Sequence, residues 1–166
     1  MIGIIYPIWS LLIYDIPRFL KNVWKFRKAL KNHYSFDYHG MLLFLQIGLN
    51  DIANYVQKHG YEVEVSRNKK IEKMQRAVQI LSNINNDTYL ELAEKEIGEE
   101  FKWSPMLSSP QDNEIQSTII QKSHEIEEKE WEELMQIIKG QDYSKFDKNV
   151  DFEKQFDGSG LRGWWD

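Results

Sequence analysis

Apolar residues recur every three or four positions through most of this 166-residue chain, and that spacing is typical of helices with one buried face. Only residues 61–65 alternate apolar and acidic side chains as a strand would. A single short strand has no partner with which to form a sheet, so we expect an extended connector there. The sequence therefore predicts an all-α fold, with about five main helices in a bundle-like domain.

The ends of the five helices are predicted from capping residues, prolines and glycines. The expected first and last residues are, in chain order, Asp15 and Leu30, Met41 and Gly60, Ser66 and Asn86, Thr88 and Gly98, and Pro110 and Gly140. Asp15 is expected to cap the first helix, with Pro17 in its first turn. Gly60 is expected to end the second helix in a left-handed conformation.

Large apolar side chains on these helices predict the core, and the chain is long enough to bury one. The predicted core residues are Trp24, Phe44, Leu45, Ile52, Met74, Leu81 and Trp131. We expect residues 1–140 to form one helical domain and residues 141–166 to form a C-terminal extension with an aromatic tail. We expect this tail to dock into the body of the same chain or, as the next choice, into a second subunit.

The first fourteen residues are nearly all apolar, but they are too few to span a bilayer. An interfacial membrane anchor using Tyr6, Trp9 and Tyr14 is the weaker alternative, because the run holds no cation that could meet lipid headgroups and the first cation is Arg18. We therefore expect no membrane association and predict that this segment is buried in the core or in the interface of a homo-oligomer.

The net charge of −5 is divided unevenly along the chain. Residues 18–76 carry a net charge of +7, and residues 77–166 carry −11. We expect the basic half to pack beside the acidic half of the same chain or of a second subunit. Binding of nucleic acid is the less favoured alternative, because the acidic chain as a whole would be repelled by a phosphate backbone.

Several kinds of chemistry are excluded by what the sequence lacks. Without cysteine there is no disulfide, thiolate metal site or cysteine nucleophile. No phosphate-binding glycine loop, dinucleotide fingerprint or hydrolase elbow occurs, and we expect no cofactor. His33, Asp37 and His39 could ligate a divalent ion, but their spacing matches no strong metal signature, so we expect ordinary loop contacts and no metal.

One enzyme class stays open as an alternative. Carboxylates three residues apart share a helix face, and two such pairs can clamp Mg²⁺. The pairs here are Glu91 with Glu94, Glu125 with Glu128, and Glu127 with Glu130. Residues 49–55 also resemble the second helix of the all-α nucleotide pyrophosphohydrolases, although Gly48 stands where that family has Glu. Solvated acidic faces are the simpler interpretation of these pairs.

The predicted binding site combines cations at the start of the third helix with the aromatic tail. Its residues are Arg67, Lys69, Lys73, Arg162, Trp164 and Trp165. Cations at a helix N-terminus oppose the helix dipole, so an anion such as phosphate would stabilise them. A tryptophan of the tail could then stack on an attached base. Contacts between these cations and the acidic fifth helix are the alternative explanation.

Three stretches together resemble a family of small helical proteins of tailed bacteriophages. They are Trp24 through Phe36-Asp37-Tyr38-His39 into the Leu-rich helix, the helix from Ser66 to Asp87, and the terminal Arg162-Gly163-Trp164-Trp165-Asp166. The resemblance implies an all-α fold, a phage origin and the host cytoplasm as location. By analogy with phage proteins that sequester nucleotide signals of bacterial immunity, we expect a non-enzymatic accessory protein that binds a small anionic ligand. The alternatives are a structural or host-protein-binding phage protein and, third, the pyrophosphohydrolase.

Overall fold

The computed structural model describes residues 9–34, 37–102 and 110–164, with no side-chain description for residues 110–112. Its main helices are α2 (Ile16–Asn32), α3 (Tyr38–His59), α4 (Glu64–Asn86), α5 (Tyr89–Ile97) and α6 (Pro110–Lys139). Shorter turns are η1 (Leu11–Asp15), η2 (Tyr143–Lys145), α7 (Phe152–Gln155) and η3 (Leu161–Gly163). No strand occurs in these ranges, so the all-α prediction with five main helices is confirmed.

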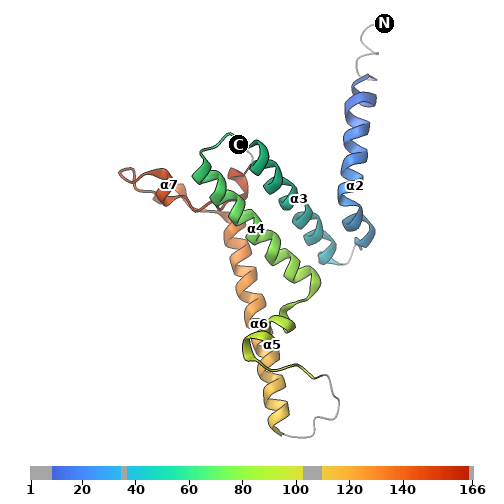
Figure 1. Ribbon diagram of the computed structural model, residues 1–166, viewed down its shortest axis with the longest axis vertical. Helices are drawn as coiled ribbons and strands as arrows, with labels where there is room; N and C mark the ends of the chain where they lie inside the picture. The colour runs from blue at the N-terminus through green and yellow to red at the C-terminus, as the bar shows by residue number, and fades with distance from the viewer. Residues whose placement is uncertain (1–8, 35–36, 103–109, 165–166) are drawn as a thin grey trace.

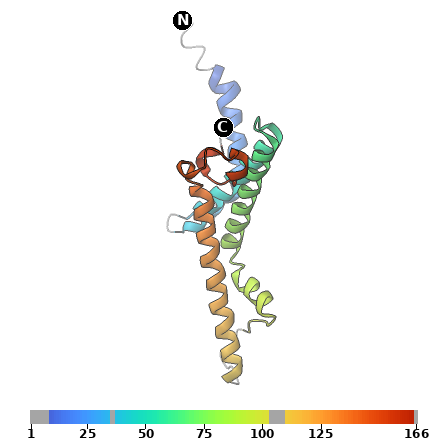
Figure 2. The same cartoon turned by 90° about the vertical axis from the view of Figure 1, so that its left-hand side faces the viewer.

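The core lies where α3, α4 and α6 meet, and the other elements extend from it. α4 packs along α3 on one side and α6 on another, while α5 lies against α6 (Figures 1 and 2). The N-terminal helix α2 contacts α3 near its own C-terminal end and runs away from the body (Figure 1). The molecule is therefore elongated, with α2 at one end and α6 at the other.

Most predicted core positions are inside. Met74 and Leu81 are fully buried, while Leu45, Ile52 and Trp131 are partly buried against the core. Phe44 is half-buried and packs on Phe26, with 5.7 Å between the ring centroids. The prediction for Trp24 is wrong, because this side chain is 69% exposed on α2. Its helical spacing correctly identified an apolar face, but no part of the described body covers that face.

The first helix begins before Asp15, so the predicted cap there is wrong. Asp15 has helical angles (φ −77°, ψ −44°) and no capping hydrogen bond. Residues 9–10 are helical and η1 is a π-helical turn, so helix runs without a break from Trp9 to Asn32. Asp37 takes the capping role in the next helix, where its side chain accepts a hydrogen bond from the backbone N–H of His39.

The connection between α3 and α4 also differs from the prediction. Gly60 has φ −63° and ψ 130°, which any residue can adopt, so its predicted left-handed conformation is wrong. Glycine is needed at this position because there is no room for a side chain. A Cβ here would lie 2.6 Å from the carbonyl oxygen of Val56. α4 then begins at Glu64 after Val63, two residues before the predicted cap at Ser66.

The C-terminal extension folds back onto the helical body. Phe156, Ser159 and Trp164 are buried, and the backbone N–H of Gly160 donates to the carbonyl of Ile137 in α6 over 2.8 Å. Trp164 therefore docks into its own chain, whereas Trp165 lies outside the described residues. Among the described helices none has the length and apolar character needed to cross a membrane.

Candidate anion-binding groove

The three predicted phosphate-binding cations of α4 each face a part of their own chain. Arg67 donates from a guanidinium nitrogen to the carbonyl of Gly60 over 3.2 Å. The ammonium of Lys69 donates to the carbonyls of Glu153 and Phe156, over 2.5 and 2.8 Å. Lys73 lies near Glu133 and contributes to lowering the pKa of that carboxyl. These contacts satisfy Arg67 and Lys69 without a ligand.

Arg76 shows the alternative that the sequence left open, a contact between α4 and the acidic helix α6. Its guanidinium forms ion pairs with Glu130 at 2.9 Å and Glu133 at 2.6 Å. The hydrogen bond from Arg76 holds the pKa of Glu133 below its usual range. Glu130 also accepts hydrogen bonds from Asn83 and from the buried hydroxyl of Tyr89, so one carboxylate joins three helices.

The predicted aromatic tail is divided between buried and exposed residues. Trp164 is 1% exposed, and its indole N–H donates to the carbonyl of Gly158 over 2.8 Å. Arg162 lies exposed in η3. With its ring faces covered, Trp164 packs as a core residue and offers no open face on which a base could stack. The structure thus brings Lys69 and the tail together through backbone contacts rather than around a ligand space.

His33, Asp37 and His39, the candidate metal ligands, lie around the end of α2 and the start of α3, and Asp37 caps α3. Asp37 accepts from both the backbone N–H and the ring Nδ1 of His39, the latter over 2.8 Å. These hydrogen bonds lower the pKa of Asp37. His33 packs edge-on against Phe44 and close to Gly40. Within the described residues no three His, Asp or Glu side chains converge as metal ligands.

One carboxylate in each of two pairs of the enzyme alternative has other partners. Glu130 is occupied by Arg76, Asn83 and Tyr89, as described above, and Glu94 accepts a hydrogen bond from the backbone N–H of Phe101 over 2.6 Å. A Mg²⁺ clamp would need two pairs facing one another across a gap. Two of these six carboxylates, Glu94 and Glu130, therefore already take part in helix–loop and helix–helix contacts.

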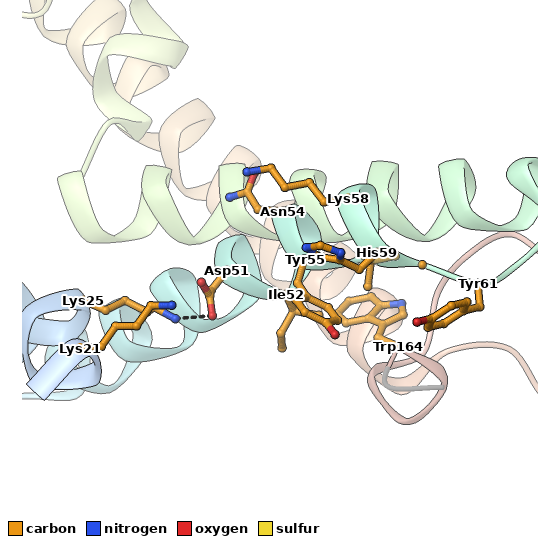
Figure 3. Close-up of a pocket in the computed structure, with 12 residues that line it drawn as sticks. Lys21, Lys25, Asp51, Ile52, Asn54, Tyr55, Lys58, His59, Tyr61 and Trp164 are labelled. Carbon is orange, nitrogen blue, oxygen red and sulfur yellow. Dashed lines mark hydrogen bonds and ion pairs between the residues drawn. The ribbon is translucent and has the colours of Figure 1, made fainter. Parts of the chain in front are cut away.

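A groove that the sequence did not predict lies between α2, α3 and the C-terminal segment (Figure 3). Its volume is about 590 Å³, within the range of small-molecule sites. Lys21 and Lys25 reach it from α2, while Tyr55, Lys58 and His59 reach it from the last two turns of α3 (Figure 3). Tyr61 and the edge of Trp164 complete the lining opposite the lysines.

The lining of this groove is cationic and aromatic. Its carboxylate, Asp51, is already paired with Lys25 at 2.5 Å. Lys58 and His59 stand in the last turn of α3, where cations offset the negative end of the helix dipole. Tyr55 and His59 lie with ring centroids 4.9 Å apart, and Tyr61 is fully exposed beside them.

The sequence pointed to some of the residues that line this groove, but not to the groove itself. Lys21 and Lys25 lie in the first predicted helix, within the basic half of the chain, and Trp164 belongs to the predicted aromatic tail. Their meeting depends on how α2 leans on α3 and on how the tail folds back, which no local pattern encodes. Comparison of the chain with protein-family models, curated protein sequences and solved structures finds no match.

Proposed function

We propose that this chain is a non-enzymatic phage accessory protein of the host cytoplasm that binds a small anionic ligand in the groove between α2 and α3. The main support is the lining of the groove. Lys21, Lys58 and His59 line it, and its carboxylate, Asp51, is already paired with Lys25. A phosphate there would neutralise cations that come from two different helices.

The aromatic side of the groove narrows the class of ligand. Exposed Tyr55 and Tyr61 offer ring faces in the same groove, and stacking of a base on an aromatic side chain contributes about 1–3 kcal/mol. A nucleotide, including a signalling nucleotide, carries both the phosphate and the base that this lining suits. Trp164 is buried at the wall of the groove, so it supports the lining and does not itself stack on the base.

Calorimetry with a panel of nucleotides tests the proposal. The panel includes nucleoside mono-, di- and triphosphates and cyclic dinucleotides, with inorganic phosphate as the fragment that lacks a base. We expect one nucleotide class to bind, and the double variant Lys21→Glu and Lys58→Glu to abolish binding while the melting temperature stays close to the wild type. Lys95→Glu, an exposed lysine on α5, is the matched control and should bind normally.

Two other results would point elsewhere. Binding that survives the double variant would place the site outside the groove. Loss of a nucleoside triphosphate in the presence of Mg²⁺ would instead support the pyrophosphohydrolase. Native mass spectrometry of the protein from infected cells separates the remaining alternatives, because it shows a retained small molecule or a partner protein directly.

A further inference from the structure

The N-terminal helix carries an uncovered apolar stripe along its full described length. Positions three and four apart bring onto one face Trp9, Leu12, Ile13, Ile16, Phe19, Leu20, Val23, Trp24 and Leu30. Each is between 38% and 69% exposed. At 1.5 Å of rise per residue the stripe is about 33 Å long. An exposed apolar surface of this extent marks an interaction site.

The stripe faces away from the rest of the molecule. The opposite side of α2 contacts α3, through the ion pair of Lys25 with Asp51 and through fully buried Ala29. Figures 1 and 2 show the N-terminal half of the helix standing clear of the body. A broad, flat partner could therefore lie along the whole stripe without touching the body.

The polar part of the same helix is strongly basic. From Ile16 to Asn32 it holds six Lys and Arg and no Asp or Glu, whereas the rest of the chain has a net charge of −11. Arg18 and Lys25 form ion pairs, with Asp15 and Asp51. Arg27 lies over the ring of Trp24, 4.1 Å from its centroid, so one cation sits on the stripe itself. Lys28 and Lys31 are exposed.

We propose that α2, with the helical turns before it, binds the surface of an anionic lipid bilayer and lies parallel to its plane. A basic polar face opposite a stripe of Trp, Phe and Leu is the pattern of helices that sink their apolar side into the headgroup boundary. The exposed lysines then reach anionic headgroups, and Trp9 and Trp24 occupy the interfacial depth that tryptophan prefers.

Charge and apolar surface together favour lipid over a second copy of the chain. Pairing two stripes would match apolar surface but would leave the exposed cations on the polar face of each copy without an anionic partner. Docking onto the acidic helix α6 would match charge, but the described part of α6 exposes only three large apolar side chains, Ile115, Ile120 and Met135. An anionic bilayer matches both properties at once.

The structure also answers the objection to membrane binding that was drawn from the sequence. That objection was the absence of a cation among the first fourteen residues. Residues 9–14 are helical and continuous with α2, so the apolar run and the six cations belong to one amphipathic helix. The inference concerns the outer face of α2 and does not depend on the proposed ligand groove.

Vesicle sedimentation with the purified full chain tests this inference. The two probes are vesicles of phosphatidylcholine alone and vesicles that also contain phosphatidylglycerol. The stripe variant carries Phe19→Glu and Leu20→Glu. Its matched control carries Ile115→Glu and Ile120→Glu, two exposed apolar residues of α6. The charge variant carries Lys28→Gln and Lys31→Gln. Circular dichroism of each variant checks that it is folded.

We expect binding to the anionic vesicles, little binding to the neutral ones, and a blue shift of tryptophan fluorescence on binding. The stripe variant should lose binding and the α6 control should keep it. Each lysine removed should weaken binding about fivefold. The proposal is overturned if the protein does not bind vesicles or if the stripe variant binds them normally. It is also overturned if size-exclusion chromatography shows a dimer that depends on the stripe and does not bind vesicles.

Discussion

The indole N–H of Trp164 donates to the carbonyl of Gly158, six residues earlier, over 2.8 Å. Gly158 has φ +87° and lies directly against the backbone of Lys69 in α4. This hydrogen bond therefore connects the buried tail to the segment that touches α4. The C-terminal extension is part of the folded core in this region, and its glycine is needed for both conformation and space.

Gly158→Ala should lower the free energy of unfolding by more than the strain of placing alanine in a left-handed backbone conformation. That backbone strain is about 1–2 kcal/mol, and the new Cβ would also collide with the Lys69 backbone, which cannot rotate away. Gly98→Ala is the matched control, because Gly98 has φ +83° with open space around it. Urea unfolding should show the larger loss at position 158. Equal losses would mean that the extension does not press on α4.

Tyr89 should make the protein sensitive to high pH. Burial and the neighbouring Glu130 raise the pKa of the Tyr89 hydroxyl above its ordinary value of about 10. A folded-state pKa that is raised gives stability that is complete below pH 10 and is lost as the pH rises toward the folded value. Tyr89→Phe should cost about 1–2 kcal/mol near neutral pH.

The comparison of wild type with Tyr89→Phe isolates this effect from the titration of lysines. The difference between their free energies of unfolding, measured in urea, should stay constant up to about pH 10 and shrink above it. A difference that grows with pH would contradict the proposed direction.

The helices were predictable because their apolar spacing is local, and the correct placing of α4 to α6 shows this. What local spacing cannot tell is whether an apolar face finds a partner in the same chain. Leu81 and Trp24 both sit on regular apolar stripes, yet Leu81 is fully buried and Trp24 is 69% exposed. The candidate site involves contacts of the same long-range kind, since the ammonium of Lys69 at the start of α4 donates to carbonyls of a tail some 85 residues away.

Substituting these two residues separates burial from spacing. Leu81→Ala removes a fully buried side chain and should cost about 2–5 kcal/mol. Trp24→Ala should change stability by no more than about 0.5 kcal/mol, since surface substitutions rarely do more. Chemical denaturation of the two variants checks this. A large loss at position 24 in the isolated protein would show that α2 is covered in solution.

Lys69→Met should destabilise the protein without weakening ligand binding in the groove. The ammonium of Lys69 donates to the carbonyls of Glu153 and Phe156, so the variant leaves two partly buried acceptors without their charged donor. Hydrogen bonds to a charged group contribute about 1.5–3 kcal/mol each. The aliphatic stem is retained by Met, so the loss reports on the charge rather than on packing.

Two measurements on Lys69→Met decide between the site predicted from sequence and the groove. If Lys69 serves the structure, thermal melting shifts downward while calorimetry with the groove's nucleotide gives an unchanged dissociation constant at a temperature where the variant is folded. If instead the melting temperature holds and binding is lost, the ligand lies at the start of α4 among Arg67, Lys69 and Lys73. Lys148→Met, an exposed lysine of the extension, is the control for loss of charge alone and should change neither quantity.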